Sequence, residues 1–254
     1  MQKYIEFNNL SAKYKNNSSL ILKDVTFSIN KGEMVAIIGE SGSGKSTIFN
    51  AILNQLQIES GEILIAGKSL KSYSKREWKK LLKLIGFLGQ DPNLIDIENV
   101  YVNLKRSYTR YKNAFYEWFG ILNQNQRNEI YETLNSLNIF DKTFSRVSDL
   151  SGGQKKRVEL AKLFLKDASL ILADEPTSNL DRKNAMEILN ILKRLNQEKQ
   201  VTILVNIHDL SLLKNNFSKF IAIKNGGVIA SGSLDKISIA ELESYYYEST
   251  QLEQ

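Results

Sequence analysis

The stretch Gly39-Glu40-Ser41-Gly42-Ser43-Gly44-Lys45-Ser46-Thr47 decides the fold of this 254-residue chain. It follows an apolar run of strand length, residues 34–38, and leads into a helical pattern over roughly residues 45–55. Its glycines allow successive backbone N–H groups to point at phosphate oxygens, and the helix adds its positive N-terminal end. This order of strand, loop and helix predicts a nucleotide phosphate-binding loop. The alternative is a strand-to-helix turn that binds no ligand.

Each residue of this loop is expected to contact the nucleotide. Lys45 would reach the β- and γ-phosphates, Ser46 would ligate Mg²⁺, and Thr47 would give a further hydrogen bond to phosphate. The other loop residues would bind phosphate chiefly through the backbone: Gly39, Glu40, Ser41, Gly42, Ser43 and Gly44. The predicted ligands are ATP and Mg²⁺.

A second apolar run, residues 170–173, ends in the adjacent carboxylates Asp174 and Glu175. Such a run predicts a buried parallel strand, and ligands of parallel sheets lie beyond the carboxyl ends of the strands. Asp174 is a candidate for holding Mg²⁺ through its water shell, and Glu175 for polarising the attacking water. In isolation the pair would be an ordinary solvated turn before Pro176. Beside a phosphate-binding loop it predicts ATP hydrolysis.

His208 is the only histidine of the chain, and it follows another strand-like run, residues 201–207. A structural histidine at a strand end is the ordinary interpretation. If this strand is parallel to the one that ends at Asp174, however, its carboxyl end faces the same crevice. We therefore expect His208 to contact the γ-phosphate and to link Glu175 to the nucleotide.

The segment Leu150-Ser151-Gly152-Gly153-Gln154 opens a strongly periodic helix. Its apolar positions are Val158, Leu160, Ala161, Phe164 and Leu165. Glycine amides and a serine hydroxyl at a helix N-terminus form an anion site. One chain would then carry two separate phosphate-binding surfaces. This is expected if each ATP lies between the loop of one protomer and Ser151 of the other.

These motifs, in this order, resemble those of ATP-binding subunits of ABC transporters, and the similarity covers about residues 3–235. The resemblance implies a Walker A loop at 39–47, a Walker B strand at 170–174 and an ABC signature at 150–154. It implies that Glu175 is the catalytic glutamate and His208 the switch histidine. It also implies a head-to-tail homodimer with two shared ATP sites.

The resemblance assigns three further positions. Gln90 resembles the Q-loop glutamine, which senses the nucleotide, takes part in catalysis and contributes to the Mg²⁺ site. Asp181 ends a stretch, residues 178–181, that resembles the D-loop of the nucleotide site. Tyr14 resembles the aromatic residue that stacks on adenine.

The sequence departs from the family pattern at three positions. Gly89 stands where an aromatic residue is common, Asn179 replaces a small residue, and Asn206 occupies a strand position that is often less polar. We expect these departures to affect coupling or interface packing rather than phosphate binding.

The order of patterns predicts an α/β fold with one P-loop NTPase core of the ABC ATPase type. Strand-like runs at residues 4–9, 22–29, 34–39 and 61–65 predict an N-terminal antiparallel β region, with Gly32 and Gly67 at turns. Residues 91–166 are helical in pattern, and strand-helix alternation resumes after Leu170. We therefore expect a single domain in which residues 1–90 and 167–254 form the core and 91–166 form an inserted helical lobe. The last residues, including Tyr245, predict a terminal amphipathic helix.

Composition limits the remaining choices. Hydrophobic residues make up 42% of the chain, enough for a sizeable core, and no apolar run reaches the roughly 18 residues needed to span a bilayer. A peripheral position at the cytoplasmic face of the membrane, held by a partner, is therefore expected. The chain has no cysteine, as fits a reducing compartment, and a net charge of +6. The lysine-rich residues 75–83 are expected to form a solvated helix face, with lipid head groups or nucleic acid as alternative partners.

Transport is the leading functional hypothesis. Residues 101–120, which include Arg106, Tyr108, Trp118 and Phe119, are similar to the helical lobe of phosphonate-type import ATPases and of related mycoplasma-type systems. This similarity implies membrane permease partners and, indirectly, an extracellular substrate-binding protein or lipoprotein for phosphonate or organophosphate cargo. An exporter or lipoprotein-releasing ATPase stays open as an alternative, as does an ABC ATPase that acts on nucleic acid. No nucleic-acid partner is expected, because neither a long coiled-coil insertion nor a second cassette is visible.

Overall fold

The computed structural model describes residues 2–108, 118, 120–178, 180–214 and 216–247. Its centre is a six-stranded sheet in the order β10-β9-β3-β8-β7-β6. The strands of this sheet are β3 (Met34–Ile38), β6 (Ile85–Leu88), β7 (Leu170–Asp174), β8 (Thr202–Asn206), β9 (Lys219–Lys224) and β10 (Gly227–Ser233). Neighbouring strands from β9 to β6 are parallel, and β10 pairs antiparallel with β9 at one edge. The carboxyl ends of β3, β7 and β8 therefore meet at one edge of the molecule.

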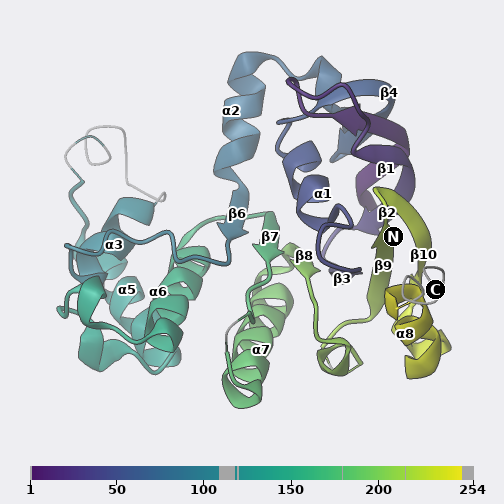
Figure 1. The fold of residues 1–254 in the computed structure, drawn as a ribbon. Coiled ribbons are helices and arrows are strands. Elements are labelled where there is room, and N and C mark those ends of the chain that lie inside the picture. Colours follow the sequence, from purple (N-terminus) through teal and green to yellow (C-terminus); the bar gives the residue numbers. More distant parts are fainter. Residues whose placement is uncertain (1, 109–117, 119, 179, 215, 248–254) are drawn as a thin grey trace.

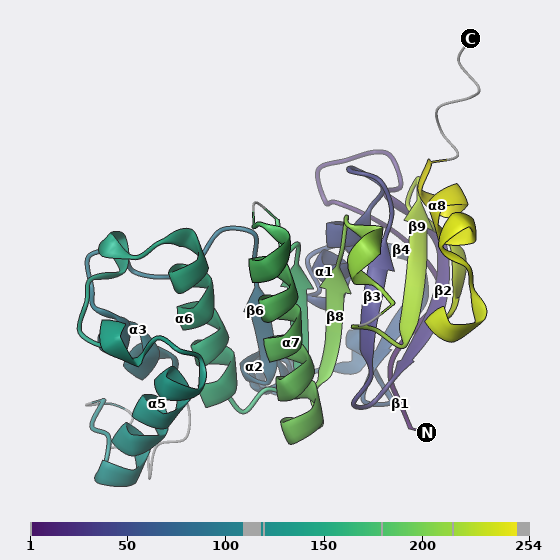
Figure 2. The ribbon, with the colours of Figure 1, turned by 90° about the horizontal axis from the view of Figure 1, so that it is seen from below.

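A second sheet is antiparallel and has the order β2-β1-β4-β5. It consists of β1 (Lys3–Lys13), β2 (Leu22–Asn30), β4 (Gln57–Ile65) and β5 (Lys68–Ser69). The predicted N-terminal antiparallel region is thereby confirmed. Figure 2 shows these strands on one side of the central sheet, with α7 (Arg182–Lys199) and α6 (Gly152–Leu165) toward the other.

The inner strands β3, β7 and β8 of the central sheet are buried along almost their whole length, which explains why their sequences are almost continuously apolar. Along β3, Met34, Ala36 and Ile38 belong to a core that includes residues of α6 and α7. The alternate residues Val35 and Ile37 belong to a second core, shared with the antiparallel sheet and with α1 (Lys45–Ile52). The central sheet thus separates two hydrophobic layers and holds the ends of its strands in fixed positions.

Three helices lie together in the middle of the sequence: α3 (Val100–Ser107), α5 (Gln124–Ser136) and α6. Figure 1 shows this group at one side of the molecule, apart from α1 and the antiparallel sheet. Ile130 and Leu134 of α5 and Leu137 at its end are all buried. Two further helices are α2 (Lys75–Lys83), which precedes β6, and α8 (Ile239–Tyr247), the predicted terminal helix. No helix within the described ranges is long and apolar enough to cross a membrane.

Several element boundaries differ from the sequence prediction, and β1 extends to Lys13 rather than ending at Asn9. Two of the differences have a clear local reason. Helix α1 ends at Ile52 rather than near Gln55, because Asn54 adopts a left-handed conformation (φ 56°) and donates its N–H to Ala51. Strand β4 starts at Gln57 rather than at Gly61. Gly61 lies within it at φ 72°, where a Cβ atom would be 2.3 Å from the carbonyl oxygen of Asn9. Glycine here marks a β-bulge, not a strand start.

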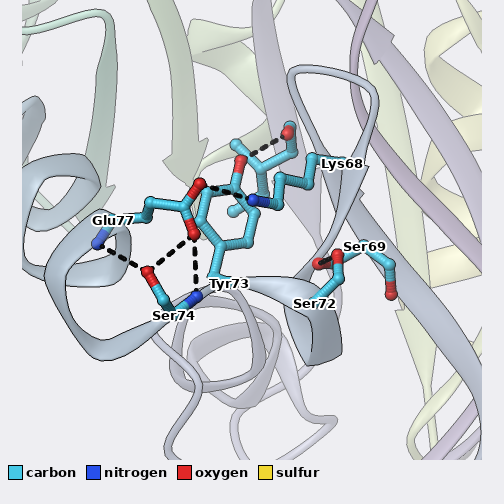
Figure 3. Close-up of polar contacts among 7 residues, drawn as sticks. Lys68, Ser69, Ser72, Tyr73, Ser74 and Glu77 are labelled. Atoms are coloured by element: carbon cyan, nitrogen blue, oxygen red, sulfur yellow. Dashed lines mark hydrogen bonds and ion pairs between the residues drawn. The ribbon is translucent and has the colours of Figure 1, made fainter.

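Helix α2 begins in a compact polar cluster (Figure 3). Ser74 and Glu77 form a capping box, in which the Ser74 side chain accepts from Glu77 N and Glu77 accepts from Ser74 N. The ammonium of Lys68 lies 2.7 Å from the Glu77 carboxylate and 4.8 Å from the centre of the Tyr73 ring. Tyr73 in turn donates its hydroxyl to Ile65 O, so the cluster ties α2 to the antiparallel sheet.

Candidate nucleotide site

The glycine-rich loop leaves β3 at the carboxyl edge of the central sheet and enters α1. Gly39 and Gly44 have φ values of 149° and 110°, which residues with a Cβ rarely adopt. A Cβ on Gly39 would lie 2.2 Å from Ile223 O and 2.7 Å from Ser43 Oγ. The loop is further held by Gly226, whose N–H donates to Ser43 O over 2.9 Å. The backbone is therefore fixed as a cradle that only glycine permits at these positions.

Lys45, the first residue of α1, folds its side chain back into this cradle. Its ammonium donates to the carbonyl oxygens of Gly39 and Glu40, each over 2.8 Å, and the residue is only 4% exposed. Burial lowers the pKa of Lys45, and the nearby carboxylates Glu175 and Asp174 oppose this shift. A positive charge held mainly by carbonyl dipoles is well suited to an incoming polyphosphate.

Three side chains from separate elements meet at the end of β7. Ser46 Oγ of α1 donates to Asp174 Oδ1 over 3.0 Å, and Asn206 Nδ2 of β8 donates to the same oxygen over 2.6 Å. Hydroxyl and carboxylate oxygens are the ligands that Mg²⁺ prefers in nucleotide sites. The donor set beside the cradle therefore fits Mg²⁺, with Ser46 and Asp174 as the residues that would hold it.

Glu175 and His208 are brought together across neighbouring strands. His208 Nε2 lies 2.5 Å from Glu175 Oε1, although the residues are 33 positions apart in the sequence. Glu175 has a left-handed backbone (φ 49°), and its carbonyl oxygen accepts from the N–H and the hydroxyl of Ser178. The turn after β7 thus aims the carboxylate away from the strand and toward the imidazole. Such a strained non-glycine residue is frequent at functional sites.

The signature segment lies elsewhere. Ser151 caps α6: its Oγ accepts from Gln154 N, and Gln154 Oε1 accepts from Ser151 N over 2.9 Å. Added Cβ atoms on Gly152 and Gly153 would meet nothing within 4 Å, so both backbones face open space. A cavity of about 450 Å³ joins this helix start to Asp181 at the start of α7. Figures 1 and 2 both place α6 well apart from α1, so one chain does not bring Ser151 to its own phosphate cradle.

The other predicted nucleotide contacts lie around these two centres. Tyr14 is half-buried beside α1, where its hydroxyl accepts from Asn50 Nδ2 over 2.7 Å. Gln90 is exposed just after β6, and its carbonyl oxygen accepts from Lys156 Nζ over 3.3 Å. Asp181 caps α7 by accepting from Asn184 N, a hydrogen bond that lowers the pKa of the Asp181 carboxyl. Their roles toward nucleotide stay predictions, as do those of Thr47 and Ser41 in the loop.

Sequence reasoning missed two features. Asn206, taken only as a departure in its strand, is fully buried and bonded to Asp174. The sequence feature that indicates a role for Asn206 is its amide side chain, which stands in an otherwise apolar strand two residues before His208. The charged residues Lys156 and Glu159 of α6 are also buried, at 5% and 4% exposure. In the sequence, Lys156 is one of several charged residues between the apolar positions of the helix. Nothing in this pattern indicates that Lys156 is buried.

The helical-lobe residues used for the import hypothesis are only partly within the described ranges. Tyr108 is buried and donates its hydroxyl to Glu129, while Arg106 pairs with Glu98. Trp118 is 86% exposed. Phe119 lies outside the described residues, as does Asn179 of the predicted D-loop.

Comparisons with known proteins identify the family of the chain. A family model described as ABC transporter matches residues 22–178. The chain is 37% identical over 221 residues to the probable ABC transporter ATP-binding protein p29 of Mesomycoplasma hyorhinis, covering 87% of this chain and 88% of the relative. It is 34% identical to the phosphonates import ATP-binding protein PhnC of Lactobacillus acidophilus, covering 88% and 87% of the two chains.

Solved structures lead to the same family. The structure of cbiO1 from Clostridium perfringens, part of the ABC transporter complex cbiONQ, has a TM-score of 0.79 at 28% identity and covers 92% of this chain and 89% of its own. A dimeric post-hydrolysis structure of the ATP-binding cassette MJ0796, bound to ADP and phosphate, has a TM-score of 0.76 at 31% identity, with coverages of 91% and 98%. The chain is thus a member of the ABC transporter ATP-binding family, with the P-loop ATPase fold and ATPase activity of that family.

Proposed function

We propose that this ATPase drives an importer for phosphonate or organophosphate cargo, working with membrane permease subunits and, through them, with an extracellular binding protein or lipoprotein. The observation that carries the ATPase chemistry is the meeting of Ser46, Asp174, Glu175 and His208 beside the glycine cradle. Import and cargo are supported by the 34% identity to an ATP-binding protein of phosphonate import.

In the proposed reaction, residues of this chain bind ATP, orient its phosphates and activate the attacking water. The amides of residues 39–47 and the Lys45 ammonium bind the phosphates of ATP. Ser46 and Asp174, with Gln90 as a further predicted contact, would hold Mg²⁺, which when bound would neutralise charge on the phosphate oxygens. Glu175 accepts a proton from the attacking water, and His208 fixes the Glu175 carboxylate and contacts the γ-phosphate.

We further propose that two copies share each ATP. Ser151 and Gly152 are exposed, added Cβ atoms on Gly152 and Gly153 would meet nothing within 4 Å, and α6 lies well apart from α1. A second copy, placed head to tail, would bring its cradle to this helix start and would enclose the nucleotide between them. Asp181 borders the same cavity as Ser151 and would lie at that interface.

A groove lined by Phe87 and Asn93, which flank Gln90 in the sequence, is the proposed docking site for a permease segment. Its volume is about 520 Å³, and it lies between α2, β6, α3 and α6. Lys79, Phe87, Arg106, Glu159 and Lys162 are among its lining residues. Because its lining combines apolar residues, such as Leu82 and Leu163, with these charged ones, it fits a short amphipathic helix. Attachment through this groove would place the chain peripherally at the cytoplasmic face of the membrane.

Affinity purification from detergent-solubilised membranes of the source cell, followed by mass spectrometry, tests this proposal. Recovery of a multi-span permease together with a surface binding protein is the expected result. A matched bait with the groove substitution Phe87→Asp, which changes an exposed residue, should lose the permease while still binding ATP. Recovery of ribosomes or DNA without any membrane protein would exclude the transport function and leave the ATPase assignment intact.

The cargo is tested on the purified binding protein. Its tryptophan fluorescence or melting temperature is measured with methylphosphonate, inorganic phosphate and glycerol 3-phosphate, and with maltose as a control. Binding of at least one phosphorus compound is expected. A binding protein that ignores all three, or a permease that moves cargo outward in vesicles, would contradict the import proposal.

A further inference from the structure

A buried ion pair in the signature helix is not used by the reaction described above. Lys156 Nζ and Glu159 Oε2 lie 3.3 Å apart, and their side chains are only 7% and 4% exposed. Ionised side chains are rarely buried to this extent unless they are paired. The burial of this pair therefore needs an explanation, and the other hydrogen-bond partners of Lys156 and Glu159 provide it.

Both members of the pair also hold the backbone that follows β6. Lys156 Nζ donates to Gly89 O over 2.5 Å and to Gln90 O over 3.3 Å. Glu159 Oε1 accepts from Asn93 N over 2.7 Å. One turn further along α6, Lys162 Nζ donates to Asn93 O over 2.5 Å. The segment 89–93 is thus held at its start and at its end by side chains of a single helix.

This attachment joins two distant parts of the proposed mechanism. The same helix begins at Ser151, where the ATP of a second copy would bind, and the segment it holds contains Gln90. Asn93, Glu159 and Lys162 also line the groove proposed for the permease. Burial raises the pKa of Glu159, whereas the Asn93 amide and Lys156 oppose the rise, as expected for a carboxylate shielded from water within this network.

We infer that Lys156, Glu159 and Lys162 are positioning residues that lock residues 89–93 to the signature helix, so that movement of Ser151 on nucleotide binding is passed to the permease groove. The three residues act through the backbone of residues 89–93. This inference rests on the proposed function, because it needs Ser151 to respond to ATP held by a second copy.

Hydrogen-deuterium exchange of the full-length chain tests it without a transport assay. Exchange is measured with and without ATP and Mg²⁺ in the Glu175→Gln background, which keeps ATP bound. The parent in this experiment is the Glu175→Gln protein without further substitution. In it, ATP should slow exchange both in the loop 39–47 and in residues 89–93, the latter by at least about tenfold. A purely structural role would change exchange of residues 89–93 equally in both nucleotide states.

The informative variant is the double substitution Lys156→Met and Glu159→Gln, which removes both charges of the pair at once and so leaves neither buried alone. The amide introduced at position 159 keeps an acceptor for Asn93 N, whereas the thioether introduced at position 156 cannot donate to Gly89 or Gln90. The ATP-dependent difference at residues 89–93 should fall from about tenfold to below about threefold, while the loop 39–47 stays protected. Glu187→Gln is the control, because Glu187 pairs with Arg157 of the same helix rather than with residues 89–93.

The outcomes distinguish a failure of this inference from a failure of the proposed nucleotide binding. If ATP does not protect the loop 39–47 in the parent, the nucleotide-binding role of that loop is wrong. If the loop is protected but residues 89–93 respond equally in the parent and in the double variant, the inference is overturned and the ATPase stands. Loss of the response in Glu187→Gln as well would also overturn it, because the effect would then belong to α6 as a whole. If the double variant fails to fold, Lys162→Met, which removes the bond to Asn93 O, is measured in its place and must reduce the response.

Discussion

At the scale of single residues, the contact between Glu175 and His208 gives the sharpest prediction. Replacing Glu175 by Gln keeps the shape of the side chain and its contact with His208 but removes the proton acceptor. ATP hydrolysis should fall by about 10²- to 10⁴-fold, the usual range for loss of a general base. ATP binding should change little, because the cradle of residues 39–47 is untouched. Steady-state phosphate release and equilibrium nucleotide binding measure the two quantities.

The control for this prediction is Glu198→Gln, which alters an exposed carboxylate of α7 paired with Arg194. It should hydrolyse ATP at the parent rate. A Glu175→Gln protein that hydrolyses ATP as fast as the parent would show that another group accepts the proton.

Asn206 carries the second residue-scale prediction. Its amide donates to Asp174 Oδ1, and its own Oδ1 has no hydrogen-bond partner within the described residues, although the side chain is fully buried. Asn206→Leu should weaken binding of Mn²⁺, used as a spectroscopic probe for Mg²⁺, by about 10- to 100-fold in the presence of ATP, as for other residues that orient a metal ligand. Electron paramagnetic resonance titration measures this affinity.

Thr202→Val provides the comparison for Asn206→Leu. Thr202 lies in the same buried strand but bonds to Gly32 N, so its loss should lower stability without changing Mn²⁺ affinity. Equal Mn²⁺ affinity in Asn206→Leu and the parent would show that Ser46 alone orients Asp174 sufficiently.

These residues show what the sequence could predict at this scale. Lys45, Asp174, Glu175 and His208 stand at fixed places in strand-to-loop motifs, so their approximate positions followed from the order of elements. The bond from Asn206 to Asp174 did not follow, because it depends on the pairing of β7 with β8, which sets Asp174 opposite Asn206. A pairing register cannot be read from either strand alone.

At the scale of elements, the cluster that starts α2 predicts a dependence of stability on pH (Figure 3). The ammonium of Lys68, then the Ser74 hydroxyl and N–H, lower the pKa of Glu77 to about 2 from 4.5. Because the folded-state pKa is lower than the unfolded value, this contribution to stability is complete above about pH 4.5. It is lost as the pH falls through the range between about 4.5 and about 2.

Glu77→Gln should therefore lower the melting temperature at pH 7 by more than it does at pH 3. Ser72→Ala tests the assignment, because Ser72 donates a neutral hydrogen bond to Ser69 O in the same region. Its effect on the melting temperature should be the same at both pH values. A pH-independent effect of Glu77→Gln would indicate that only the uncharged capping contacts matter.

Element boundaries were harder to predict than element types. Strands β3, β7 and β8 and the signature helix followed from apolar runs and periodicity, because those patterns reflect burial directly. The end of α1 at Ile52 and the bulge at Gly61 depend on a left-handed Asn54 and on the neighbouring carbonyl of Asn9. The buried charges of α6 were missed for a related reason: their partners lie in residues 89–93, 67 and 66 positions away.

At the scale of the whole molecule, the separation of Ser151 from the cradle determines how the ATP site must be assembled. Helix α6 packs against α3, α5 and α7, whereas α1 packs against the other face of the central sheet. Bringing both phosphate-binding surfaces of one chain to one ATP would require the two hydrophobic layers to separate. Sharing ATP between two copies requires no such rearrangement.

Mixing two inactive variants tests this sharing directly. Gly153→Asp places a carboxylate in open space at the start of α6, where it should stabilise the helix yet repel the phosphates bound by a second copy. Glu175→Gln removes the proposed base from the cradle side. Each variant alone should be nearly inactive. A mixed dimer, however, contains one site built from the intact cradle of the first variant and the intact signature of the second. An equimolar mixture should therefore recover about a quarter of the parent ATPase activity, since half of the randomly formed dimers are mixed and each has one intact site.

Gly153→Ala, which fills the same open space without a charge, should stay active and serves as the control. If the mixture is no more active than its components while each variant still binds ATP, the site is not shared between copies, and Ser151 has a role other than binding the nucleotide of a partner.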